Sequence, residues 1–280
     1  MTELLSLLTR PFFLRALCVG TLVSVCAALL GVSLVLKRYA MIGDGLSHVS
    51  FAAVAIGAIL GGAIGNFHPM LVALPIVLVA AVLLLRIRES SRMQGDSVIA
   101  ILSTAALALG SILIYKSELS AELGSYLFGS LFAVTHTDLA VSIPLAVAVL
   151  ILFVLFYNDI FRITFDENFA HATGTRTGLY NLLVACLTAV TVVLGMQMMG
   201  SLLISALIVF PALTAMRVFC SFRQVVIAAA VLAVVCFFIG IFLSFFANTP
   251  VGASIVAVHL VAFCGFWVYG TVRNRNRGNA

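Results

Sequence analysis

Long stretches without a charged residue dominate this sequence. Asp, Glu, Lys and Arg are all missing from residues 16–36, 45–85, 97–115, 139–158, 177–216 and 224–272. Apolar residues make up 63% of the 280 residues and charged residues 9%, whereas a soluble domain carries about 25% charged residues. A chain with so few charged residues cannot form a surface that is stable in water. A bilayer tolerates an apolar surface when helices satisfy the backbone hydrogen bonds internally. We therefore predict an all-α fold, a polytopic transmembrane helical bundle.

The lengths of the uncharged stretches predict eight to nine spans. One span needs about 20 apolar residues, so each of the three longest stretches holds two. Each of these three contains a polar break where a turn fits, at residues 66–69, 197–201 and 248–252. We expect the spans to form one transmembrane domain over residues 1–280.

The basic residues predict the orientation. When the spans alternate and the C-terminal segment is cytoplasmic, 12 of the 15 Lys and Arg residues lie on the cytoplasmic side, as the positive-inside rule requires. The acidic residues Glu118, Glu122 and Asp138 then lie on the outer side. Counting residues 119–136 as a span would destroy this asymmetry, so we predict a short outer or re-entrant helix there.

The largest cytoplasmic connection, residues 158–177, has a helix signal at its centre. In the segment DENFAHATG, residues 166–174, Asp166 can accept hydrogen bonds from the first free N–H groups and Gly174 can end the helix. With so little apolar content the segment cannot span a membrane. It is either a surface loop or a docking element for a partner.

Asp44 and His48 form the most informative pair of side chains. They stand four residues apart near the start of the second span, so both project from one helix face. Ionisable groups at membrane depth mark ion or substrate paths, and carboxylate with imidazole is a ligand set for Zn²⁺, Mn²⁺ or Fe²⁺. The alternative is that Asp44 serves the helix N-terminus and His48 is a packed side chain. Two ligands would suit a site that must release its cargo, and a two-fold dimer could bring four together.

The remaining signals limit the choice of function. His259 lies inside the last span and is a second candidate for the pathway. The motifs of intramembrane metalloproteases, serine hydrolases and P-loop ATPases are missing from the sequence. The protein is therefore not expected to be an enzyme, and a partner would have to hydrolyse any ATP. A proton-coupled metal carrier that acts alone stays open, because Asp44 and His48 could also relay protons.

Four stretches of the sequence match a known family. They are GVSLVLKRYAMIGDGLSHVSF (31–51), DENFAHATG (166–174), MGSLLISALIVFPALTA (199–215) and PVGASIV (250–256). With them the chain resembles the membrane permease subunit of the bacterial ABC-type zinc, manganese and iron importers. The resemblance covers about residues 14–269, and the GDGLSHVSF variant is closer to the zinc branch.

The resemblance implies partners and roles. It implies a homodimeric permease in the bacterial cytoplasmic membrane, with a cytoplasmic ABC ATPase dimer and an extracytoplasmic metal-binding protein. Zn²⁺ or Mn²⁺ would be cargo, with no permanently bound cofactor, and ATP would bind the partner subunit.

The resemblance also implies roles for individual residues. Asp44 and His48 match the family's metal-pathway pattern. The segment at 166–174 matches the coupling helix, which implies ATPase coupling by Asp166, Glu167, Phe169, Ala170 and Gly174. The metal-binding protein is expected to dock on the outer side near Glu118, Glu122 and Asp138.

Overall fold

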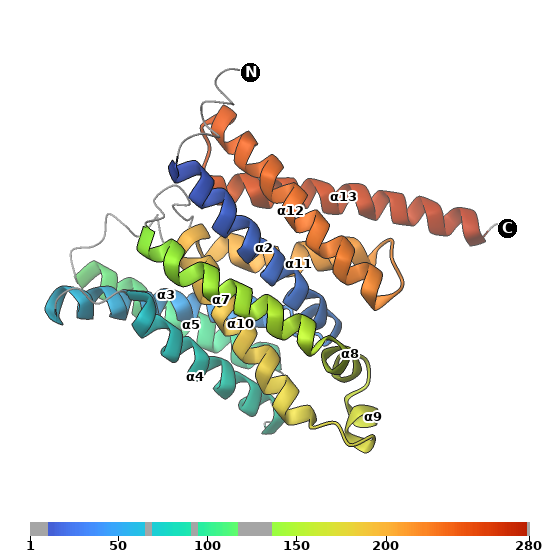
Figure 1. The fold of residues 1–280 in the computed structure, drawn as a ribbon, viewed down its shortest axis with the longest axis horizontal. Helices are drawn as coiled ribbons and strands as arrows, with labels where there is room; N and C mark the ends of the chain where they lie inside the picture. Colours follow the sequence, from blue (N-terminus) through green and yellow to red (C-terminus); the bar gives the residue numbers. More distant parts are fainter. Residues whose placement is uncertain (1–10, 65–68, 91–94, 117–135, 279–280) are drawn as a thin grey trace.

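The described part of the chain is entirely helical. The computed structural model describes residues 11–64, 69–90, 95–116 and 136–278, and these ranges contain no β-strand. Figure 1 shows long helices packed side by side, with two short helices at one end of the bundle. The long helices are α2 (Pro11–Leu36), α3 (Met41–Ile64), α4 (Pro69–Ser90), α5 (Gly95–Lys116), α7 (His136–Leu155), α10 (Thr177–Met199), α11 (Ser201–Met216), α12 (Phe222–Ala247) and α13 (Val251–Gly278). The short helices are α8 (Tyr157–Phe165) and α9 (Glu167–Ala172).

Seven of the described helices are long and apolar enough to cross a membrane. Two more contain shorter apolar stretches, Met70–Arg86 in α4 and Ser201–Met216 in α11. The helical membrane architecture predicted from the uncharged stretches is confirmed. The count of eight to nine spans stays a prediction, since it depends on whether the two shorter helices cross the bilayer.

The polar breaks fall where the helices end. Gly200 separates α10 from α11 with a φ of 84°, which L-residues with side chains rarely adopt. Asn248 ends α12 in the left-handed conformation with a φ of 51°, as asparagine readily does. The third break lies between α3 and α4, at residues 65–68, which are outside the described residues.

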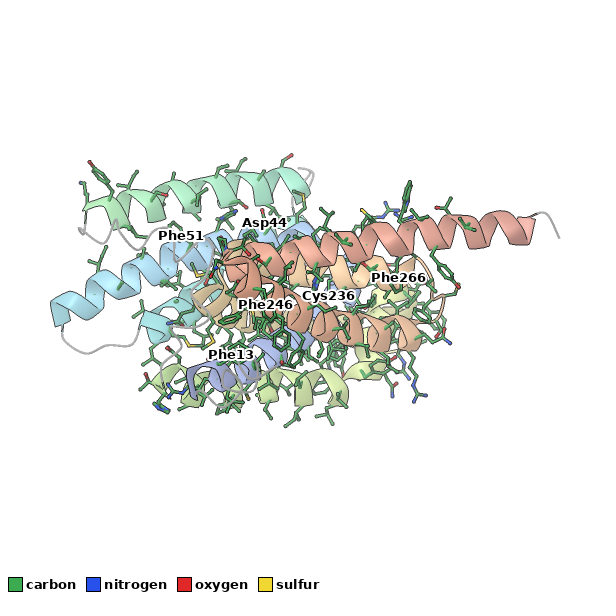
Figure 2. All side chains as sticks on the ribbon, turned by 90° about the horizontal axis from the view of Figure 1, so that it is seen from above. Phe13, Asp44, Phe51, Cys236, Phe246 and Phe266 are labelled. Carbon is green, nitrogen blue, oxygen red and sulfur yellow. The ribbon has the colours of Figure 1, made fainter. Side chains whose placement is uncertain are left out.

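The helices form an inner and an outer group. The candidate spans of α2, α3 and α10 are 67%, 61% and 67% buried, whereas those of α5, α7 and α13 are 28%, 22% and 22% buried. The outer group exposes large apolar side chains such as Leu109, Val154 and Val261, which suits contact with lipid. Helix α3, which carries Asp44 (labelled in Figure 2), therefore belongs to the inner group.

Helix α8 was not expected from the sequence, which predicted one short helix in the connection 158–177. The structure shows that Phe156 interrupts the helical path after α7 and that α8 follows as a separate helix. It buries Ile160 and Ile163 against the bundle. Its outer face packs aromatic rings on the start of α12, with the centroids of Phe161 and Phe222 5.2 Å apart. The short helices thus lie at the bundle end where α10 and α12 begin (Figure 1).

Candidate functional site

The turn between α2 and α3 places Asp44 in the first turn of α3. The Tyr39 N–H donates to the Leu34 carbonyl at 2.7 Å and closes α2, with Arg38 in the left-handed region at a φ of 61°. The Ile42 N–H then donates to the Tyr39 carbonyl at 3.0 Å as α3 begins. A carboxylate in the first turn of a helix is favoured by the helix dipole.

The structure brings Asp44 and His48 together, as their spacing predicts. His48 Nε2 lies 3.7 Å from Asp44 Oδ1. Ser205 of α11 donates from its Oγ to the same Asp44 Oδ1 at 3.2 Å, shares this proton with the Ser201 main-chain carbonyl at 3.0 Å, and lies 3.4 Å from Ser47 Oγ. Ser47 Oγ in turn donates to the Asp44 main-chain carbonyl at 2.7 Å. One carboxylate, one imidazole and two hydroxyls therefore meet where α3 crosses α11.

Sequence reasoning missed Ser47 and Ser205. Ser205 lies 161 residues from Asp44, and no local spacing relates two residues that far apart. The signal was present in the stretch 199–215, one of the four that carry the family resemblance. What was missing was the packing of α11 against α3, which aims the Ser205 hydroxyl at the carboxylate.

The pair is only partly covered by the rest of the chain. The Asp44 side chain is 49% exposed and that of His48 is 21% exposed. His48 Nδ1 is buried and has no hydrogen-bond partner within the described ranges. A half-exposed carboxylate on an inner helix of a membrane protein needs water, a cation or a second chain in front of it. The Asp44 carboxylate is thus open on one side of the chain.

Across the described residues, no group of three or more His, Cys, Asp or Glu side chains could hold a metal ion. His259 in particular does not extend the pair into such a cluster. Its side chain is 2% exposed, and neither ring nitrogen has a hydrogen-bond partner in the part of the chain described here. Asp44 and His48 alone are fewer than the three or four ligands that hold a metal ion firmly.

We expect His259→Leu to leave metal uptake within about twofold of the parent, because exchanging an unpartnered buried polar group for an apolar one of similar size is nearly neutral. Uptake of radioactive Mn²⁺ by cells, normalised to the amount of protein in the membrane, measures it. Loss of uptake at an unchanged protein level would instead place His259 in the pathway.

Helix α9 forms where the sequence predicts it. Asp166 caps the helix, with its Oδ1 accepting the Phe169 N–H at 2.9 Å, and Gly174 follows the helix with a φ of 87°. Phe169 is 66% exposed, whereas Ala170 is 1% exposed. Of these predicted coupling residues, Phe169 therefore projects away from the bundle, and Ala170 packs the helix against it.

Of the three residues predicted to dock the metal-binding protein, only Asp138 belongs to the described part of the chain. Asp138 lies in the first turn of α7 and is half-buried. Glu118, Glu122 and the expected outer helix, apart from His136, lie outside the described residues.

Comparison with known proteins identifies the family. The model of the ABC 3 transport family matches residues 9–269. The manganese import system permease protein ScaB of Streptococcus gordonii is 30% identical over 252 residues, which cover 90% of this chain and 89% of the relative. The probable iron transport system membrane protein of Haemophilus influenzae is 30% identical over 267 residues, covering 93% and 92%.

A solved structure agrees with these relatives. PsaBC from Streptococcus pneumoniae, in complex with Fab, superimposes with a TM-score of 0.85 at 29% identity and covers 95% of each chain. The named relatives give the zinc expectation no specific support, since their names refer to manganese and iron. The chain belongs to the ABC 3 transport family and is a multi-pass metal permease of the bacterial plasma membrane.

Proposed function

We propose that this permease imports a divalent metal ion along a pathway that passes Asp44 and His48. The observation that carries the proposal is the half-exposed Asp44 carboxylate on an inner helix, 3.7 Å from an imidazole nitrogen and accepting a hydrogen bond from Ser205. A carboxylate and an imidazole bind divalent transition metals well and bind Na⁺ or K⁺ poorly.

We propose further that two copies of the chain share one pathway. One chain supplies two ligands, which is fewer than the three or four that hold a metal ion firmly. A second copy related by a two-fold axis would present the same pair from the opposite side. The exposure of Asp44 in the single chain supports this arrangement, because a partner would cover the carboxylate.

Manganese is the first choice of cargo, ahead of iron and zinc. The donors around the Asp44 carboxylate are the Ser47 and Ser205 hydroxyl oxygens and one imidazole. Carboxylate oxygen suits Mn²⁺ and imidazole suits Zn²⁺ and Fe²⁺, so these donors are compatible with all three metal ions. The order of preference comes from the names of the Streptococcus gordonii and Haemophilus influenzae relatives, which refer to manganese and iron.

A separate ATPase would supply the energy, and a binding protein would supply the metal. Helix α9, with its exposed Phe169, is the surface on which we expect a cytoplasmic ABC ATPase dimer to dock. On the opposite side, an extracytoplasmic metal-binding protein would dock near Asp138, together with Glu118 and Glu122. ATP-driven closure of the ATPases would move α9 and alternate the access to Asp44.

Metal-resolved uptake tests this proposal. The permease is reconstituted in proteoliposomes with its ATPase, and entry of radioactive Mn²⁺, Fe²⁺ and Zn²⁺ from the binding protein is measured separately. We expect ATP-dependent uptake, with Mn²⁺ fastest. Uptake that continues without the ATPase and stops with an uncoupler would instead establish a proton-coupled carrier. Uptake that is fastest for Zn²⁺ would overturn the choice of manganese.

A further inference from the structure

A partly buried ionic junction ties α9 to the end of α2. Lys37, the first residue after α2, has its Nζ 3.3 Å from Glu167 Oε2 and donates to Asn181 Oδ1 at 2.5 Å. Asn181 Nδ2 donates to Glu167 Oε1 at 2.6 Å. These three side chains, which we call the Lys37 junction, form a closed network among α9, α10 and the turn after α2.

Burial sets the junction apart from a surface ion pair. The Lys37 side chain is 8% exposed and Asn181 is 5% exposed, so the ammonium group has little access to water, whereas the Glu167 side chain is 43% exposed. A charge in such a place is costly unless partners hold it in good geometry. The Asp159–Arg162 pair on α8 is the contrast, because its atoms are 3.5 Å apart and the Arg162 side chain is 60% exposed. A pair of that kind contributes little to stability.

The junction is directly connected to the metal site by the chain. Only the closed turn around Arg38 and Tyr39 separates Lys37 from α3, and Asp44 follows Lys37 by seven positions. The turn is held by main-chain hydrogen bonds at both ends, so a shift of Lys37 moves the start of α3 with it. A movement of Glu167 on the proposed ATPase surface can therefore be passed through Lys37 and the turn to the start of α3, where Asp44 lies.

A small cavity of about 30 Å³ lies beside the junction. It is lined by Lys37 and Asn181 themselves, by Tyr39 and Ile42 of the turn and α3, and by Ile163 and Thr164 of α8. Close-packed interiors resist displacement, because there is no free volume for side chains to enter. The cavity has space for about one or two water molecules, and it lies where α8 and α10 meet α2 and the turn after it.

We propose that the Lys37 junction is the joint that transmits movement of α9 to α3, so that Lys37, Glu167 and Asn181 act as positioning residues for the metal site. The inference rests on the proposed function, because it requires that an ATPase acts on α9. It adds that the charge pair between Lys37 and Glu167, rather than α9 docking alone, sets how many metal ions are moved for each ATP hydrolysed.

The test uses the reconstituted permease–ATPase complex with the binding protein and Mn²⁺. Four forms are compared with the parent. They are Lys37→Met, Glu167→Gln, the double neutral form that combines these two substitutions, and the exchange of Lys37→Glu with Glu167→Lys. Arg162→Gln is the matched control, since it breaks an exposed pair at the same end of the bundle. Mn²⁺ uptake, ATP hydrolysis and the amount of intact complex by gel filtration are measured on each form.

The double neutral form is the decisive one, because it leaves no uncompensated buried charge and is expected to assemble. We expect it to hydrolyse ATP but to move roughly tenfold fewer Mn²⁺ ions for each ATP, the size of a typical coupling between two sites. The exchange is expected to recover most of the parent ratio, and Arg162→Gln to match the parent. A parent ratio in the double neutral form, or no recovery in the exchange, would overturn the junction while the proposed function stands. Transport by the parent that needs no ATPase would overturn both.

Discussion

Metal uptake is expected to fall more than ~100-fold when Asp44 or His48 is replaced by alanine, while the permease still assembles with its ATPase. Each chain contributes a single carboxylate and a single imidazole to the site, 3.7 Å apart. Mutating even the outer partners of metal ligands costs about 10–100-fold in affinity or activity, so losing one of two ligands costs at least as much. Radioactive Mn²⁺ uptake in proteoliposomes, with gel filtration of the complex, measures both outcomes.

Two serine variants serve as controls for this result. Ser205→Ala removes the hydroxyl that donates to Asp44 Oδ1 at 3.2 Å and is expected to reduce uptake about tenfold, as an outer partner would. Ser50→Ala truncates a buried hydroxyl elsewhere on α3, and this hydroxyl has no hydrogen-bond partner in the described part of the chain. Its uptake should equal that of the parent. Near-parent uptake by both Asp44→Ala and His48→Ala would remove the pair from the pathway.

A charged or bulky residue at position 170 is expected to separate ATP hydrolysis from metal transport. Ala170 is 1% exposed beneath α9, so Ala170→Trp has no space to occupy and must lift the short helix from the bundle. Overpacking of this kind costs about 1–3 kcal/mol, which is a large penalty for a helix of six residues. We expect ATP hydrolysis to continue in the complex while Mn²⁺ uptake falls to background.

Substitution of Gly178 tests whether the effect of the Ala170 variants is specific to α9. Gly178 lies at the same end of the bundle, and a Cβ placed there meets no atom within 4 Å. Gly178→Asp should therefore leave uptake and hydrolysis unchanged, whereas Ala170→Asp should reduce uptake as Ala170→Trp does. Unchanged coupling in both Ala170 variants would mean that α9 is not the docking element.

The features that the sequence predicts well are set by neighbours along the chain. Helix ends follow from local backbone chemistry, so Gly200 and Asn248 ended helices where polar breaks were expected. The cap of α9 by Asp166 needs only the N–H three residues later. The Asp44 and His48 side chains lie on one face because they are four residues apart. Helix α8 escaped prediction because no Gly or Pro separates it from α7, and only the interruption at Phe156 divides the two helices.

The sequence by itself determined that the chain is a helical membrane protein, where its helices break, and which carboxylate and imidazole stand together. These properties depend on the solvent around a span and on hydrogen bonds between near neighbours. Only the tertiary structure decided that Ser205 faces Asp44 across 161 positions and that Lys37 meets Glu167 and Asn181 across 130 and 144. The physical reason is that helix packing, which no local spacing records, chooses which faces of distant helices meet.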